Sequence, residues 1–167
     1  MNFRKHFAWA LVILWMAVIF SLSAQPASAS NDLSRGITAL IIDLIQKILP
    51  MVNLTLNDFN HYVRKNAHFI AYFLLGFLVI NALMVGETVE KLKNFKERGS
   101  AAYRRRWLLA GLICVSYAIS DEVHQLFVPG RGGQVKDVLI DSGGAATGIL
   151  VYVWGRRLLS RWRVKRG

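Results

Sequence analysis

The stretch WLLAGLICVSYAISDEVHQ, residues 107–125, carries fourteen residues without a charge and then two adjacent carboxylates, Asp121 and Glu122. The uncharged part is typical of a membrane-spanning helix. Charged side chains at membrane depth cost about 3 kcal/mol or more each, so they usually face a protein interior or a water-filled cavity. The stretch therefore predicts a helical membrane protein and places its functional residues near Asp121.

Three other apolar runs lie at residues 7–22, 69–85 and 138–154, in a chain of 167 residues that is 54% hydrophobic. A transmembrane helix needs about 17–25 predominantly apolar residues. We therefore expect an all-α fold, in which residues 1–167 form a single multi-pass membrane domain. The four predicted transmembrane helices cover about residues 7–23, 68–85, 107–127 and 137–155, and a polar loop covers residues 86–106.

The net charge of +11 is distributed unevenly along the chain. Fifteen of the 21 Lys and Arg residues precede the first predicted span, lie in the 86–106 loop or follow the fourth span. Cytoplasmic segments of membrane proteins carry such an excess, so we expect a protein of the cell membrane with both termini and this loop in the cytoplasm. The basic residues then favour anionic membrane lipids as partners rather than nucleic acid. Cys114 is the single cysteine, so no disulfide can form within the chain.

The N-terminal apolar run is open to two interpretations. It is followed by Ala27-Ser28-Ala29, which resembles the A-x-A cleavage site of a secretory signal peptide. The run is already close to spanning length, which favours a retained first helix that stops at residues 23–26. Cleavage after Ala29 is the alternative, and it would leave three helices.

An outer segment of about forty residues separates the first two predicted spans. Its apolar side chains between residues 33 and 49 recur at helical spacing, which predicts an amphipathic helix on the outer face. Asn31 or Asp32 is a suitable N-cap for this helix, and Pro50 is a suitable stop. The sequence leaves open whether the helix only covers the bundle or also contacts a substrate.

Gly144 and Gly148 form a G-x-x-x-G motif in the fourth predicted span. Small residues at this spacing allow two helices to approach closely within a membrane. Packing against another helix of the same chain is the favoured interpretation, and dimerisation is the alternative.

Polar residues from three of the predicted spans converge at one depth, in the outer third of the membrane. Residues four positions apart share one face of a helix. Such pairs are His68 with Tyr72, Asp121 with Gln125, and Asp137 with Asp141. Asp121 lies about 21 Å along its helix from residue 107, in a hydrocarbon core about 30 Å thick. We therefore expect one outward-facing site, joined by Arg131 from the loop at residues 128–134.

Two stretches that carry these residues resemble the signature regions of the VanZ-like family of small multi-pass bacterial membrane proteins. They are KNAHFIAYFLLGFL at residues 65–78 and SDEVHQLFVPGRGGQVKDVLIDSGGAATG at residues 120–148, and SLSAQP at residues 21–26 also resembles the family. The founding member of that family is associated with resistance to the glycopeptide antibiotic teicoplanin. The resemblance implies that the characteristic polar positions are Lys65, His68, Asp121, Glu122, Gln125, Arg131, Asp137 and Asp141. At the last of these positions the family often has Asn.

Within the predicted site, His68 with Asp121 or Glu122 is the candidate acid–base pair for catalysis. Arg131, between glycines, offers a guanidinium fork and exposed backbone N–H groups that suit a phosphate or carboxylate. The other predicted ligand-binding residues are Lys65, Tyr72, Gln125, Asp137 and Asp141. The expected ligand is a cell-envelope lipid or a glycopeptide-type molecule, and the sequence names no cofactor. No metal site is predicted, because the histidines show no H-E-x-x-H or comparable ligand spacing.

Two other interpretations of the polar cluster stay open at this point. In the first, Lys65 or Arg131 pairs with the carboxylates and only holds the helices in register. In the second, the cluster belongs to a small transporter, although four short helices enclose little room without oligomerisation. The enzymatic interpretation stands beside these two.

Overall fold

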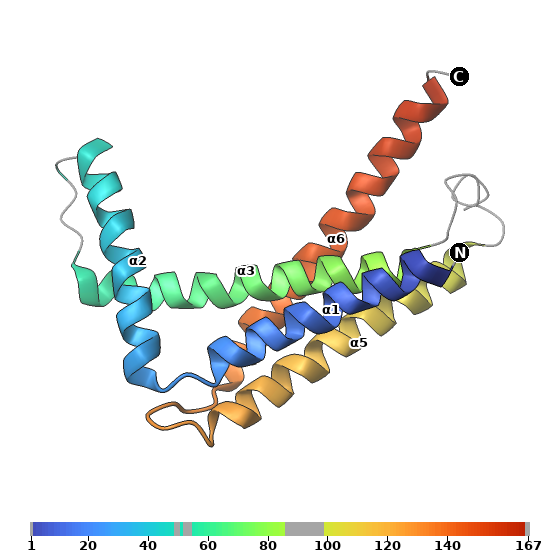
Figure 1. The fold of residues 1–167 in the computed structure, drawn as a ribbon. Coiled ribbons are helices and arrows are strands. Elements are labelled where there is room, and N and C mark those ends of the chain that lie inside the picture. Colours follow the sequence, from blue (N-terminus) through green and yellow to red (C-terminus); the bar gives the residue numbers. More distant parts are fainter. Residues whose placement is uncertain (1, 49–50, 52–54, 86–98, 166–167) are drawn as a thin grey trace.

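The computed structural model describes residues 2–48, 51, 55–85 and 99–165. Within these residues the chain forms five helices and no strand, so the all-α prediction is confirmed there. The helices are α1 (Asn2–Ser23), α2 (Ala27–Ile48), α3 (Leu56–Met84), α5 (Gly99–Gln125) and α6 (Val135–Lys165). Figure 1 shows their arrangement.

Three of the described helices are long and apolar enough to cross a membrane. The candidate spans are Phe3–Ser23 in α1, Phe59–Met84 in α3 and Val135–Leu159 in α6. The chain is therefore a helical membrane protein. The uncharged part of α5 is shorter, since it is bounded by Arg106 and Asp121, and the fourth span stays a prediction.

α5 and α6 extend beyond the apolar runs that predicted them. α5 begins at Gly99, within the segment predicted as a polar loop, and α6 continues to Lys165. Their added ends are rich in Arg, Ala and Leu, which are good helix formers despite the charge. Residues 86–98 of the predicted loop lie outside the described part of the chain.

α1 ends at Ser23, as predicted, but α2 begins earlier than the sequence suggested. Its first residue is Ala27, so the predicted N-cap at Asn31 or Asp32 is wrong. The physical reason is Pro26, whose fixed φ suits the start of a helix and whose carbonyl accepts a hydrogen bond from the Ser30 N–H at 3.0 Å. α2 ends at Ile48, and the predicted stop at Pro50 lies outside the described residues.

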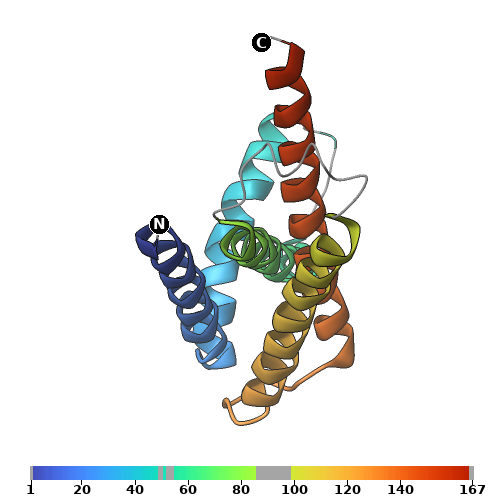
Figure 2. The ribbon, with the colours of Figure 1, turned by 90° about the vertical axis from the view of Figure 1, so that its right-hand side faces the viewer.

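α3 is the central helix of the molecule. It contacts each of the other four described helices, and α1 and α5 run along its sides in Figures 1 and 2. Its side chains Tyr72, Leu75, Val79 and Ile80 are fully buried and form the middle of the apolar core. α3 therefore sets the position of the polar residues one turn before Tyr72.

α2 crosses one end of α3 in Figure 1. It turns Ser34, Thr38 and Ile42 inward, and Thr38 Oγ1 donates a hydrogen bond to Asn60 Oδ1 at 3.1 Å. Leucines on its other side, such as Leu33 and Leu40, are exposed. α2 thus contacts the bundle through Ser34, Thr38 and Ile42, and much of the apolar surface of α2 faces away from the rest of the chain.

Glycines bring α3 and α6 into direct backbone contact. A β-carbon at Gly144 would collide with the carbonyl of Phe69, and one at Gly148 would collide with the carbonyl of Phe73. A β-carbon at Gly76 of α3 would likewise meet the backbone of Ala145 in α6. The G-x-x-x-G motif therefore packs within the chain, which confirms the favoured interpretation.

Candidate functional site

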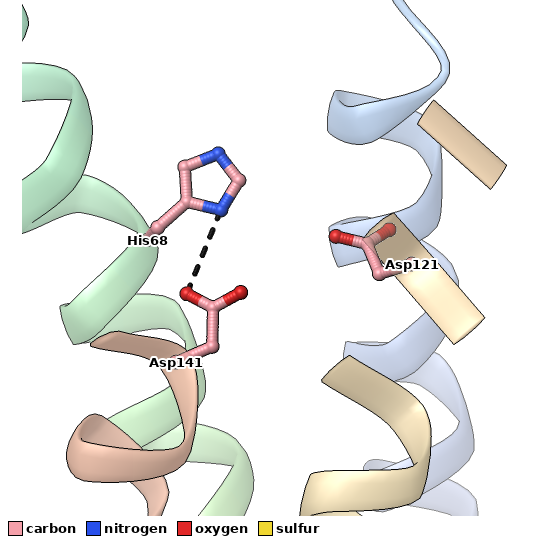
Figure 3. Close-up of side chains that lie close together, drawn as sticks. All are labelled: His68, Asp121 and Asp141. Carbon is pink, nitrogen blue, oxygen red and sulfur yellow. Dashed lines mark ion pairs between the residues drawn. The ribbon is translucent and has the colours of Figure 1, made fainter. Parts of the chain in front are cut away.

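α3, α5 and α6 bring His68, Asp121 and Asp141 together in the interior (Figure 3). One ligand atom from each side chain lies within 4.8 Å of the other two. His68 Nδ1 lies 3.7 Å from Asp141 Oδ1, which is longer than a hydrogen bond. Asp121 is 2% exposed and Asp141 is 0% exposed. The convergence of three helices on one polar point is thus present in the structure.

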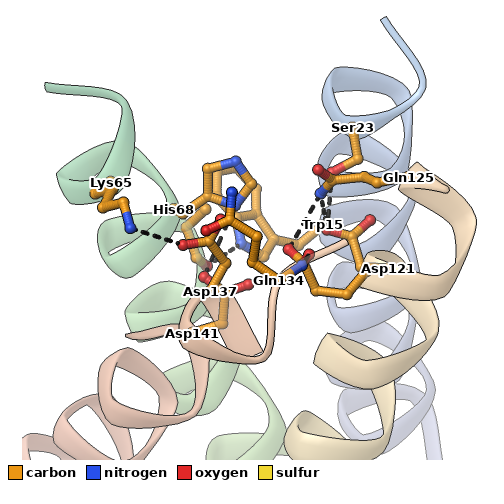
Figure 4. A network of polar contacts seen from close by, with 11 residues as sticks. Trp15, Ser23, Lys65, His68, Asp121, Gln125, Gln134, Asp137 and Asp141 are labelled. Atoms are coloured by element: carbon orange, nitrogen blue, oxygen red, sulfur yellow. Dashed lines mark hydrogen bonds and ion pairs between the residues drawn. The ribbon is translucent and has the colours of Figure 1, made fainter. Parts of the chain in front are cut away.

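The two aspartates of this cluster have buried oxygens that lack hydrogen-bond donors. Asp121 Oδ2 accepts hydrogen bonds from Ser23 Oγ at 2.8 Å and from Gln125 Nε2 at 3.4 Å (Figure 4). Asp121 Oδ1 and both carboxylate oxygens of Asp141 have no such partner among the described residues. The cluster therefore contains three buried acceptor atoms that have no hydrogen-bond donor among the described residues.

Glu122 is adjacent to Asp121 in sequence but is bound elsewhere. Its Oε2 accepts a hydrogen bond from the backbone N–H of Gln134 at 2.8 Å, which ties the loop before α6 to the end of α5. A β-carbon at Gly133 would lie 2.6 Å from the Glu122 carbonyl, so the loop needs glycine there. The two carboxylates diverge because neighbouring helical residues are turned about 100° apart. Gln125 Nε2 lies 3.4 Å from an oxygen of each and is shared between them.

Lys65 and Asp137 form an ion pair above the cluster. Their charged atoms lie 3.1 Å apart, and their side chains are 27% and 28% exposed. Asp137 and Asp141 share one face of α6 and meet Lys65 and His68 on α3 (Figure 4). This is the ion pair between helices that the sequence anticipated.

A polar cavity of about 180 Å³ opens beside His68 and Asp141. Its basic lining residues are His61, Arg64, Lys65, His68 and Arg131, and its acidic ones are Asp137 and Asp141, of which Asp137 is paired with Lys65. Burial and the nearby Arg64 guanidinium both lower the pKa of Arg131, although an arginine stays charged at physiological pH. Like charges held close together favour an anion between them.

A second cavity of about 140 Å³ lies between α1, α2 and α3. Apolar side chains such as Ile19, Leu33 and Ile37 form much of its wall. It shares Arg64, His68 and Arg131 with the polar cavity. The two cavities therefore lie next to each other, one with a polar wall and one with a largely apolar wall.

Comparison with known proteins gives the chain its family. The family model described as VanZ/LLP1 matches residues 7–158. The chain belongs to the VanZ/LLP1 family. No curated protein and no solved structure matches it.

In this VanZ/LLP1 protein, the predicted site residues divide by position. Those that line the polar cavity are Lys65, His68, Gln125, Arg131, Asp137 and Asp141. Asp121 lies behind the cavity in the buried cluster, and Glu122 fixes the loop. Tyr72 is fully buried with its ring 6.1 Å from that of Tyr117, and neither cavity wall includes it.

Sequence reasoning missed Ser23, His61, Arg64 and Gln134. Arg64 is four residues before His68, so helical spacing alone could have placed the two on one face of α3. Ser23 carries a weaker signal, because its hydroxyl reaches Asp121 only after α1 has packed against α5. Gln134 contributes its backbone N–H, a group that every residue except proline carries, so the sequence could not indicate its role.

Proposed function

We propose that this VanZ/LLP1 protein binds the anionic head group of a cell-envelope lipid at an outward-facing site. The supporting observation is the pair of cavities, one polar and one apolar, which share Arg64, His68 and Arg131. A guanidinium group offers a planar pair of donors that matches a phosphate or carboxylate. The apolar cavity suits the part of a lipid chain nearest to its head group.

The proposed topology has four spans, with α5 as the fourth and with both termini in the cytoplasm of a cell-membrane protein. The distribution of basic residues supports it. In Figure 1 the loop between α5 and α6 lies at the opposite end of the bundle from the N-terminus. Arg131 and the polar cavity would then face the outside, where envelope lipids carry their cell-wall cargo.

A lipid-linked cell-wall precursor as the ligand would connect this site to glycopeptide resistance, the property associated with the founding member of the family. Teicoplanin resistance is accordingly part of the proposal. For a reaction on the head group, His68 is the residue placed to move a proton, because its imidazole borders the cavity. The Glu122 carboxylate already accepts a hydrogen bond from the loop, so we assign it a role in positioning that loop and none in proton transfer.

A structural role is the second candidate function. The Lys65–Asp137 ion pair joins α3 to α6, and the Glu122–Gln134 hydrogen bond joins α5 to the loop. Such contacts hold helices in register without any ligand. On this alternative, every variant that loses function should also lose stability.

The test is ligand binding to the purified full chain in detergent. The three probes are a long-chain lipid phosphate, the same lipid as a free alcohol, and inorganic phosphate. We expect the lipid phosphate to bind most tightly and Arg131→Ala to weaken it by about 10- to 100-fold, the range for losing a hydrogen bond to a charged group. Lys47→Ala is the control, because Lys47 is exposed on α2 and pairs with Asp43. Equal binding of the alcohol and the phosphate would refute the proposal.

A further inference from the structure

We propose that His68, Asp121 and Asp141 hold a divalent transition-metal ion at the base of the polar cavity. One ligand atom from each residue lies within 4.8 Å of the others. The three residues come from three different helices, so the arrangement depends on the tertiary fold and not on local sequence. The inference stands on this geometry and does not require the envelope lipid proposed above.

The distances suit ligands of one ion better than they suit hydrogen bonds. His68 Nδ1 and Asp141 Oδ1 are 3.7 Å apart, whereas an N–H···O hydrogen bond is about 2.7–3.2 Å long. With metal–ligand bonds of about 2.1 Å, two ligands of a tetrahedral zinc ion lie about 3.4 Å apart. The widest separation in the cluster, at most 4.8 Å, then needs to shrink by at most about 1.4 Å when the ion binds.

The unsatisfied oxygens give an independent reason to expect a cation. Asp121 Oδ1 and both oxygens of Asp141 are buried without a hydrogen-bond donor among the described residues. A buried carboxylate in that state is costly unless a positive charge or a proton compensates it. Lys65 is already paired with Asp137. A protonated His68, 3.7 Å from Asp141, would neutralise only one of the two aspartates. A metal ion would neutralise both aspartates and use the free oxygens as ligands.

The hydrogen bonds around Asp121 resemble those that hold a carboxylate ligand in a metal site. Ser23 and Gln125 donate hydrogen bonds to Oδ2 and leave Oδ1 without a hydrogen-bond donor. Ligating carboxylates in metal sites are commonly held in this way by hydrogen bonds from neighbouring groups. Replacing Ser23 should therefore weaken metal binding, although Ser23 is not itself a metal ligand.

The open side of the cluster indicates the kind of site. His68 and Asp141 border the polar cavity, so a water molecule or an anion could take the next coordination position. Three protein ligands with one open position are typical of catalytic rather than structural zinc. One imidazole and two carboxylates suit Zn²⁺ or Mn²⁺ better than softer ions. Arg131, across the same cavity, would hold the far side of an anion bound to the metal.

The test is metal binding to the purified full chain without added lipid. After treatment with a chelator, the protein is titrated with Zn²⁺, Mn²⁺ and Mg²⁺, and bound metal per chain and thermal stability are measured. We expect one Zn²⁺ or Mn²⁺ per chain and a higher melting temperature with the ion. Asp141→Asn and His68→Gln should each weaken binding by at least about 100-fold, because each removes a ligand.

Asp137→Asn is the matched control. It changes a carboxylate on the same face of α6, one turn earlier and in the same cavity, but outside the cluster. It should retain the ion within about 10-fold of wild-type affinity. The proposal is overturned if wild type binds neither ion, or if Asp141→Asn binds as tightly as Asp137→Asn. If wild type binds neither ion, protonation of Asp141 would explain how its oxygens stay buried without hydrogen-bond donors. Lipid phosphate binding by the metal-free protein would still test the proposed function separately.

Discussion

Gly148→Ala should loosen the contact between α3 and α6 on which the polar site depends. The added β-carbon would collide with the carbonyl of Phe73 and lie 3.0 Å from the backbone nitrogen of Phe77. Backbone atoms cannot rotate away, so the helices must separate by roughly 1 Å. Overpacking of this kind costs about 1–3 kcal/mol, and the better helix propensity of alanine returns at most about 1 kcal/mol. Because the colliding atoms belong to the backbone, the cost should lie in the upper part of that range, and the net loss of about 1–2 kcal/mol should lower the melting temperature by about 2–8 °C for a chain of this size.

The assay is thermal unfolding of the purified protein in one detergent, followed by tryptophan fluorescence. Gly155→Ala is the control, because Gly155 lies in the same helix and a β-carbon added there would have no neighbouring atom within 4 Å. That variant should unfold at the wild-type temperature or slightly above it. Equal melting temperatures for the two variants would show that the α3–α6 contact is not as close as described. Because His68 and Asp141 face each other across this contact, Gly148→Ala should also weaken lipid phosphate binding.

Three other outcomes are expected. Arg131→Lys should retain part of the lipid phosphate binding and Arg131→Ala almost none, because lysine keeps the charge but loses the planar fork; full binding by Arg131→Ala would remove this residue from the site. Lys65→Met should cost at most about 1 kcal/mol of stability in thermal unfolding, since its ion pair with Asp137 is partly exposed, and a larger loss would favour the structural role. Cysteine labelling in a Cys114→Ser background should reach residue 131 from outside intact cells but not residue 95, and the reverse pattern would invert the topology.

The sequence predicted the helical fold because hydrophobic runs and their flanking charges are local properties. It placed the end of α1 at Ser23 correctly, and it anticipated that Gly144 and Gly148 pack within the chain. It misplaced the start of α2, because residues 23–26 were interpreted only as the stop of the preceding helix, and because a contact from another part of the chain also holds this start. The N–H of Ala27, for example, donates to the carbonyl of Pro129 at 3.2 Å.

The polar cluster was predictable in part for the same reason. Helical spacing put Asp137 and Asp141 on one face of α6, and the structure pairs that face with α3. The rotation of each helix about its own axis depends on tertiary packing, which the sequence does not encode locally. Tyr72 therefore proved to be fully buried outside both cavities, while Ser23 and Arg64 joined the site.

The order of synthesis gives one structural feature a further meaning. The chain is made from α1 to α6, so Asp121 is synthesised before Asp141. The Glu122 side chain accepts its hydrogen bond from the Gln134 N–H, only twelve residues later, so this contact needs no part of the chain beyond the loop. A nascent chain that stops after α5 holds Ser23, His68 and Asp121 but lacks the last side of the cluster. The proposed site is therefore complete only when the final helix is in place.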